Sequence, residues 1–402
     1  MIFPSINFRH SIAPFAVVAA VIFFVIFVGT ATQKSSAEES ADKIIALCKN
    51  DSYRQGCYDR EISKLMDRLT LEETFKVTSI VQDKDSGYPY CHVLGHLLGG
   101  VETAKDPSQW KEVAGRCPTN MCSNGCMHGV FQERFRAEAL PDSSVNDVST
   151  ILGGICEPKN DWNTTLLEQA TCTHALGHLT MYVTNANTRK SLLICNRISI
   201  NKDGYDFRPL CYDGVFMQIF QPLEPEDFAL IEGKVPDKNE VKKFCFSFLG
   251  EERNSCWSES WPLASDVLKE GPANAVSFCG KLSDAESQKK CLTDIFYIMA
   301  AQLNLDEKKI TDYCGKGIGK VKGQCFAAAA TRFLEVDSRN IKKTVRFCQT
   351  AETLGSGDAC YRQLSSYASY NFSRGSKEFN NLCQSLPQKW RALCFSGRSS
   401  TI

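Results

Sequence analysis

The apolar positions of this chain recur with the spacing of amphipathic helices, in units of about 35 residues. Phe326 to Glu335, for example, is an alanine-rich helical stretch. A turn at Val336-Asp337-Ser338 separates it from a second helix that ends at Phe347. No run of alternating apolar residues is long enough to predict a sheet. The pattern therefore predicts an all-α protein built from two-helix units.

Cysteines mark these units. In the C-terminal half, five cysteine pairs each enclose 10 or 11 residues, and their second cysteines follow one another at steps of 35, 34, 35 and 34 residues. The series extends toward the N-terminus through Cys57, Cys91, Cys126, Cys172 and Cys211, with insertions where the steps are longer. A period of roughly 34–36 residues is typical of two-helix solenoid repeats. We therefore expect an α-solenoid of about ten units.

The 20 cysteines also indicate an oxidising compartment, because no Cys-x-x-Cys pair supports thiolate zinc sites. A disulfide that closes a loop of about ten residues stabilises a small unit by about 2.5–3 kcal/mol in the chain-entropy model. The spacing predicts nine pairs: Cys48–Cys57, Cys117–Cys126, Cys156–Cys172, Cys195–Cys211, Cys245–Cys256, Cys279–Cys291, Cys314–Cys325, Cys348–Cys360 and Cys383–Cys394. Cys91 and Cys122 remain and could pair with each other. A Cys122–Cys126 pair is the alternative that spacing leaves open.

The period and the helical pattern resemble the two-helix repeats of the Sel1 and tetratricopeptide families. The Trp, Gly, Tyr and Pro signature of tetratricopeptide repeats is absent, so the resemblance concerns architecture alone. It implies a stack of helical hairpins and transfers no functional residue.

The N-terminus predicts export. An uncharged apolar run from Ile12 to Gly29 is nearly long enough to span a bilayer. We expect a membrane-anchoring signal anchor within residues 1–33, and a cleaved signal peptide is the alternative. The remainder then faces the extracytoplasmic side (periplasmic, extracellular or lumenal), and it is secreted if the segment is removed.

Three regions follow this segment. Residues 41–221 form histidine-bearing helical repeats, residues 222–243 form a linker rich in proline and charge, and residues 244–396 form helical repeats without histidine. Lys plus Arg and Asp plus Glu both total 46, so the formal net charge is zero. Because nucleic-acid binding normally needs a basic face, we expect no nucleic-acid partner.

Five of the six histidines lie just after the cysteines that mark the units. Cys91-His92-Val-Leu-Gly-His96 matches Cys172-Thr-His174-Ala-Leu-Gly-His178, and each places two imidazoles four residues apart on one helix face. Cys126-Met-His128-Gly-Val-Phe matches Cys211-Tyr-Asp213-Gly-Val-Phe in the same way. The N-terminal half therefore reads as a duplicated pair of helical hairpins.

The duplication predicts two sets of metal ligands on one wall of the repeats. His92, His96 and His128 form one set, and His174, His178 and Asp213 form the other. Three protein ligands with open positions suit zinc or iron, and copper also binds imidazole. If the superhelix curls tightly, all six side chains could converge on one two-metal site.

Two features of the sequence support such a convergence. Gly95, Gly129, Gly177 and Gly214 lower helix propensity by about 1 kcal/mol each relative to alanine, and a glycine within a helix usually permits close approach of another backbone. Glu133 and Gln218 lie one turn beyond the ligand positions and could serve as outer partners of the ligands or as general bases.

Two functions fit these features. The first is a membrane-anchored, extracytoplasmic protein that binds a transition metal, with a hydrolase or oxidoreductase activity as an extension. The second is a membrane-anchored interaction scaffold whose concave face binds a protein or peptide and whose histidines are structural. The sequence leaves open whether the protein is an enzyme.

Overall fold

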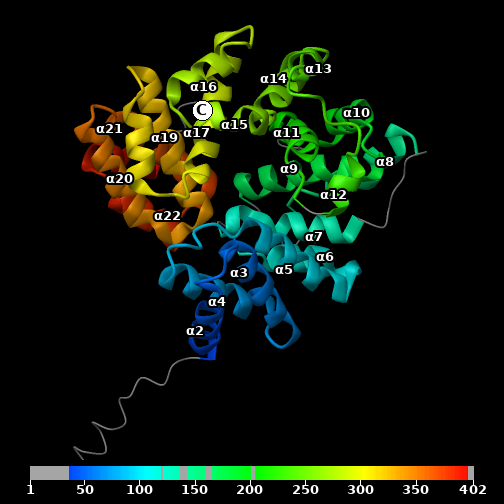
Figure 1. The fold of residues 1–402 in the computed structure, drawn as a ribbon, viewed down its shortest axis with the longest axis horizontal. Helices are drawn as coiled ribbons and strands as arrows, with labels where there is room; N and C mark the ends of the chain where they lie inside the picture. Colours follow the sequence, from blue (N-terminus) through cyan, green and yellow to red (C-terminus); the bar gives the residue numbers. More distant parts are fainter. Residues whose placement is uncertain are drawn as a thin grey trace, which may run out of the picture.

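The computed structural model describes residues 36–118, 121–135, 143–158, 165–200, 204–223 and 225–396 (Figure 1). This part of the chain is helical, with two isolated bridges (Met121 with Asp337, Ile200 with Asp206) and no strand among the described residues. The predicted all-α class is confirmed. None of the described helices has both the length and the apolar character needed to cross a bilayer. The expected membrane segment, residues 1–33, lies outside the described ranges.

The helices follow one another in short steps. The α-helices are α2 (Ser36–Cys48), α3 (Arg54–Ser63), α4 (Leu71–Lys84), α5 (His92–Lys105), α6 (Trp110–Arg116), α7 (Gly125–Phe135), α8 (Val145–Leu152), α9 (Leu166–Val183), α10 (Thr188–Ile198), α11 (Arg208–Phe220), α12 (Pro225–Leu230), α13 (Val241–Cys245), α14 (Gly250–Glu259), α15 (Ser265–Leu268), α16 (Pro272–Cys279), α17 (Ala285–Gln302), α18 (Glu307–Gly315), α19 (Lys320–Val336), α20 (Ile341–Thr353), α21 (Gly357–Asn371), α22 (Lys377–Ser385) and α23 (Gln388–Ser396). The 3₁₀ turns are η1 (Lys64–Asp67), η2 (Pro107–Gln109), η3 (Cys122–Asn124), η4 (Trp261–Ala264) and η5 (Ser338–Asn340).

Ten disulfides join the helical repeats, and nine of them have the partners that the spacing predicts. Nine of them tie the helix or turn that ends one unit to the helix that begins the next. The tenth, Cys91–Cys122, spans 31 residues and joins the start of α5 to η3. All 20 cysteines are therefore paired, as expected for an oxidising compartment.

Side-chain caps define where the helices begin. The side chains of Thr70, Ser144 and Thr165 each accept a hydrogen bond from the backbone N–H three residues on. The carboxylate of that later residue in turn accepts one from the backbone N–H of the capping residue. Asp306 caps α18 by accepting hydrogen bonds from the backbone N–H groups of Lys308 and Lys309. Such caps contribute about 1 kcal/mol each and fix the register at which each repeat helix starts.

The first helices of the repeats pack against one another in chain order: α3, α5, α7, α9, α11, α14, α17, α19, α21 and α23. The chain also returns on itself, because α19 contacts η3 and α21 contacts α9 (Figure 1). The guanidinium of Arg332 donates to the hydroxyl of Tyr90 over 3.0 Å, and Arg339 pairs with Asp83 at 2.9 Å. A solenoid of nearest-neighbour repeats lacks such long-range contacts. Side chains from both halves therefore share one interior.

Two pairs of helices, α5 with α7 and α9 with α11, approach more closely than side chains normally allow. A Cβ atom on Gly129 would lie 2.0 Å from the carbonyl oxygen of His96, and one on Gly214 would lie 2.1 Å from that of His174. Only glycine fits at these positions, so the predicted close approach is confirmed. It brings the histidine-bearing turns of neighbouring repeats together.

The buried apolar residues form two clusters, one reaching from Ala37 to Ile194 and the other from Met181 to Cys394. Helix α9 contributes to both, so the two cores meet beside the histidines. The segment predicted as a linker, residues 222–243, contains α12, and the Asp227 side chain on this helix is buried. The boundary between the two sets of repeats stays a prediction.

Adjacent glycines on α5 provide a test of the close approach. A Cβ on Gly99 would lie 2.1 Å from the carbonyl oxygen of Cys126, whereas a Cβ on Gly100 has no neighbour nearer than 3.8 Å. We expect Gly99→Ala to lower the free energy of unfolding by about 1–3 kcal/mol, as other overpacking substitutions do. Chemical denaturation followed by circular dichroism measures the change.

Gly100→Ala is the matched control, because it adds the same methyl group one residue along. It should leave stability unchanged or raise it by up to about 1 kcal/mol through helix propensity. Equal effects of the two substitutions would contradict the close packing of α5 on α7.

Candidate metal centre

Five histidines from three helices gather in the shared interior. His92 and His96 lie on α5, His128 on α7, and His174 and His178 on α9. The ring of His128 lies between the two pairs, with its centroid 5.3 Å from His92, 5.1 Å from His96, 5.4 Å from His174 and 5.9 Å from His178. The first helices of three successive repeats therefore meet at one polar cluster inside an otherwise apolar core.

The first three histidines converge most closely. Nε2 of His92 and Nε2 of His96 are 3.2 Å apart, and one ring nitrogen from each of His92, His96 and His128 lies within 4.8 Å of the others. All three residues are buried, with 7–8 % of their surface exposed. A buried group of three imidazole nitrogens at this separation could hold a metal ion.

The α9 pair repeats this geometry. Nε2 of His174 and Nε2 of His178 are 3.3 Å apart, and their ring centroids are 5.0 Å apart. Both side chains are half-buried. The corresponding centroid separation for His92 and His96 is 4.7 Å. The duplication seen in the sequence is thus also present in the arrangement of the rings.

A backbone carbonyl fixes the tautomer of His92. Nδ1 of His92 is 3.1 Å from the carbonyl oxygen of Cys122. A carbonyl can only accept, so Nδ1 carries the proton and Nε2 of the neutral ring keeps its lone pair. This arrangement, with Nδ1 donating to an acceptor and Nε2 directed inward, is common among metal-binding histidines.

The turn that presents this carbonyl is strained. Cys122, Ser123 and Asn124 all have positive φ, at 52°, 49° and 58°, a region that residues with a side chain rarely adopt. The Cys91–Cys122 disulfide holds this turn against the first residue of α5. The one disulfide that joins distant parts of neighbouring repeats therefore also positions the acceptor for His92.

In the second pair, Gln218 accepts the Nδ1 proton of His178, as the Cys122 carbonyl does for His92. Its Oε1 lies 2.8 Å from Nδ1 of His178, so Nδ1 donates and Nε2 keeps its lone pair. The sequence singled out Gln218 as an outer partner, and the structure places it there. Glu133, the other residue singled out, lies near Gly100 of α5.

Burial keeps all five imidazoles neutral. It is the largest cause of the lowered pKa of each ring, and it lowers the pKa of His96 and of His174 to about 3. Neighbouring histidines add to the effect for His92 and His128, and Gln218 opposes it for His178. At neutral pH the rings are therefore free of the proton that would compete with a metal ion.

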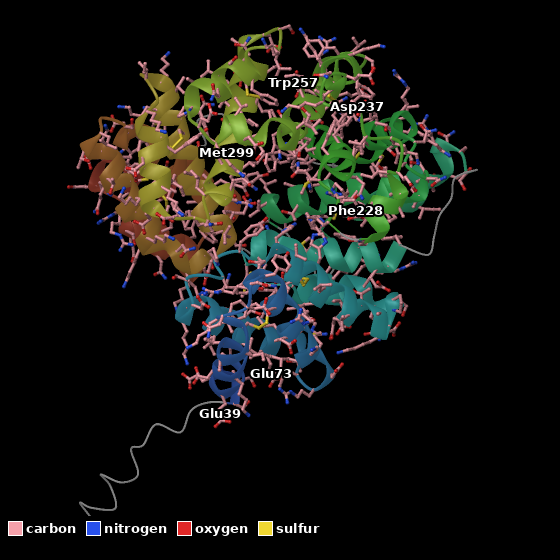
Figure 2. The ribbon with its side chains drawn as sticks, in the orientation of Figure 1. Glu39, Glu73, Phe228, Asp237, Trp257 and Met299 are labelled. Atoms are coloured by element: carbon pink, nitrogen blue, oxygen red, sulfur yellow. A yellow bond between two sulfur atoms is a disulfide. The ribbon has the colours of Figure 1, made fainter. Side chains whose placement is uncertain are left out.

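A small cavity of about 20 Å³ lies between the two pairs. His96, His128 and His178 line it, together with Gln132, Tyr182, Gln218, Gln221 and Asp227. Asp227 comes from α12, beside the exposed Phe228 that Figure 2 labels, and it hydrogen-bonds the hydroxyl of Tyr182. A cavity of this size holds about one water molecule.

Two ring nitrogens in the cluster have no hydrogen-bond partner. They are Nδ1 of His96 and Nδ1 of His128, and Nε2 of Gln218 is likewise buried without one. A hydrogen bond with Gln132 raises the pKa of His96 against the effect of burial, while Nδ1 of His96 remains without a partner. Because an unsatisfied buried polar atom costs about 1–3 kcal/mol, a purely structural role leaves this cluster incompletely explained.

Asp213 lies apart from the histidines. Its carboxylate does not join the group of three ligand atoms found among the described residues, and its charge acts instead on Glu259, Lys290 and Asp294. Burial and then Asp213 raise the pKa of Glu259. Asp213 follows Cys211 as His128 follows Cys126, so it points to the next repeat just as His128 points to His174.

Several residues at the site carried no signal in the sequence. Tyr182 and Asp227 come from the end of α9 and from the predicted linker. Tyr90, whose ring stacks on His92 at 5.9 Å, is held by Arg332 from the histidine-free half. None of them belongs to the repeated motif. Tyr90 and Tyr182 lie close to the histidines in the sequence, whereas the tertiary fold brings Asp227 and Arg332 to the cluster.

The chain matches no protein-family model, no curated protein and no solved structure. The geometry of the site therefore carries the functional argument.

The lowered histidine pKa values predict a pH dependence of stability in metal-free protein. The pKa of His96 is about 3 in the folded protein and about 6.5 in the unfolded chain. The unfolded chain therefore takes up a proton first as the pH falls. The contribution of His96 to stability is complete above about pH 6.5 and is lost as the pH falls toward 3. His96→Gln removes this group. Its destabilisation relative to wild type, measured by urea unfolding with chelator present, should shrink steadily as the pH falls below 6.5.

Asp294 gives a control of opposite sign. Burial raises its pKa to about 7, so protonation stabilises the folded protein as the pH falls from 7 toward 4. Asp294→Asn should therefore become more destabilising relative to wild type in this range. A pH-independent difference between His96→Gln and wild type would show that His96 is not a buried neutral ring.

Proposed function

We propose that this protein binds a transition-metal ion through His92, His96 and His128. The observation that carries the proposal is the facing pair of Nε2 atoms, with the proton of His92 fixed on Nδ1. Two nitrogens that share a tetrahedral ion with bonds of about 2.0–2.1 Å lie about 3.3–3.4 Å apart, close to the 3.2 Å separation here. His128, with a buried unpartnered nitrogen, supplies the third ligand.

The ligand chemistry favours zinc, iron or copper. Imidazole is a borderline-soft donor that suits these ions, whereas magnesium and calcium prefer oxygen ligands. Any reaction at the ion would involve a molecule of one or two heavy atoms, such as water or dioxygen, because the adjoining cavity measures about 20 Å³. A hydrolase acting on a large substrate fits this cavity poorly, and an oxidoreductase acting on a small one fits it better.

We also propose that the protein lies outside the cytoplasm and is attached to the membrane. Ten disulfides support an oxidising, extracytoplasmic compartment. The apolar run from Ile12 to Gly29 supports attachment to the membrane by residues 1–33. The competing proposal, a scaffold that binds a protein or peptide partner and uses its histidines structurally, predicts the same location but no bound metal.

Metal analysis distinguishes the two. Protein produced with its disulfides and without a histidine tag should contain at least one zinc, iron or copper ion per chain by elemental analysis. His92→Ala and His96→Ala should lower the content at this site below one tenth. An ion present at about 100 times its dissociation constant stabilises the fold by about 2.7 kcal/mol, so a chelator should lower the melting temperature.

Asp213→Asn is the matched control, because Asp213 lies on the next repeat and outside the cluster. It should leave the metal content unchanged. Absence of stoichiometric metal, together with unchanged stability of His92→Ala, would favour the scaffold.

The Cys91–Cys122 disulfide provides a second test. Replacing both cysteines by serine frees the turn that holds the carbonyl acceptor of His92. Loss of an outer partner usually costs 10–100-fold in metal affinity, and we expect a decrease of that size by competition with a chelator of known affinity.

The same double replacement at Cys383 and Cys394 is the control, since this pair joins α22 to α23, far along the chain from the cluster. It should lower thermal stability without changing metal affinity. Equal affinity in the two double variants would exclude a role for the Cys122 carbonyl in metal binding.

A further inference from the structure

We propose that His174 and His178 bind a second metal ion, so that the cluster is a two-metal centre. This inference rests on the proposed function, because it adds an ion to the one held by His92, His96 and His128. Its starting point is the α9 pair, whose Nε2 atoms face each other at 3.3 Å. That separation equals the roughly 3.3–3.4 Å expected for two nitrogens on one tetrahedral ion.

The hydrogen bonds around this pair leave no proton between the two rings. Nδ1 of His178 donates to Oε1 of Gln218 over 2.8 Å, so its Nε2 carries a lone pair. The backbone of Leu210 raises the pKa of His174 against the effect of burial, as a carbonyl that accepts from the ring does. A ring that donates to such a carbonyl carries a lone pair on its other nitrogen. Two lone pairs that face each other at this distance repel unless a cation lies between them.

The first pair differs from the second in this respect. His92 donates to Cys122, but Nδ1 of His96 has no partner, so His96 could place its proton on Nε2 and donate to His92. A hydrogen bond between the rings of the first pair would still leave Nδ1 of His96 as a buried acceptor without a partner, whereas the second pair has both of its outer nitrogens engaged with acceptors. The need for a cation is thus greatest at His174 and His178.

The supporting helices are built alike at the two positions. A Cβ on Gly177 would lie 2.2 Å from the carbonyl oxygen of Cys211, and one on Gly99 would lie 2.1 Å from that of Cys126. Each contact locks a histidine-bearing helix against the first helix of the next repeat. Rigid elements of this kind hold ligands in place before the ion arrives, which lowers the cost of binding.

The two ions would be neighbours. His128 stacks on His174 with centroids 5.4 Å apart, and the cavity of about 20 Å³ is lined by His96 and His128 from one side and by His178 from the other. A single solvent molecule in that cavity would reach both ions. Two-metal centres that share solvent in this way typically have ions about 3.5–4 Å apart.

Counting bound ions in matched variants tests the inference. Titration of metal-free protein with Co²⁺ or Zn²⁺, followed by gel filtration and elemental analysis, should give two ions per chain for wild type. His174→Ala/His178→Ala should retain one, and His92→Ala/His96→Ala should also retain one. Far-UV circular dichroism and melting curves establish that each variant is folded before the count.

The outcomes separate the two claims. One ion in wild type, retained in His174→Ala/His178→Ala, overturns the second site and leaves the proposed function intact. No ion in wild type overturns both. Loading with Cu²⁺ gives a further check, since neighbouring ions couple magnetically. Electron paramagnetic resonance of wild type should account for less copper than elemental analysis, and a full-intensity spectrum would contradict adjacent ions.

Gln218 supplies a test that avoids the ligands. Gln218→Leu removes the acceptor for His178 and should weaken the second ion 10–100-fold while leaving the first unchanged. Gln218→Glu keeps an acceptor and adds a negative charge beside the ion, so it should retain or strengthen binding. If the cluster is only structural, Gln218→Glu should be the more damaging of the two variants, because its buried carboxylate has no cation to pair with and is costly. Weaker binding in the glutamate variant than in the leucine variant would therefore overturn the inference.

Discussion

The close approach of α5 to α7 and of α9 to α11 is the constraint on which the centre depends. At these crossings the backbone of one helix lies against the backbone of the next, where a single methyl group would collide with a carbonyl oxygen about 2 Å away. Imidazole side chains are short, so helices separated by ordinary side chains would keep them apart. Glycine removes that separation. The histidines can then meet even though they belong to different repeats.

Disulfides make this arrangement stable in a chain of small helices. Each unit alone buries little apolar surface, and the pair that closes it reduces the entropy of the unfolded state. Cys91–Cys122 differs because it joins two units and holds a strained turn in place. Strain that persists in a structure is commonly associated with a functional site. Here it places a carbonyl oxygen against the imidazole of His92.

The two halves of the chain contribute differently to the centre. The histidine-bearing half supplies all five imidazoles, while the other half supplies Arg332, which holds Tyr90 against His92. The permanent charge of Arg332 also disfavours protonation of His92 and lowers its pKa, in addition to burial and His96 and against the raising effect of the Cys122 carbonyl. The repeats without histidine thus take part in the interior of the protein, and they are more than a support for the first five units.

The sequence by itself determined the local features of this protein. The helical class follows from the period of the apolar residues. The disulfide partners follow from cysteines that recur at one spacing, and the facing imidazoles follow from histidines four residues apart on a helix. Even the close approach at Gly129 and Gly214 could be predicted, because glycine inside a helix is otherwise unfavourable.

Only the tertiary structure decided which residues from different repeats meet. Asp213 occupies the position equivalent to His128 and, like His128, faces the repeat that follows its own. That repeat carries no histidine, so Asp213 acts on Lys290 and its neighbours and lies outside the cluster. Asp227 reaches the interior through α12, and Arg332 reaches Tyr90 through the return of the chain, which depends on how much each repeat turns relative to the last. That small rotation accumulates over ten units, and no local pattern of residues encodes it.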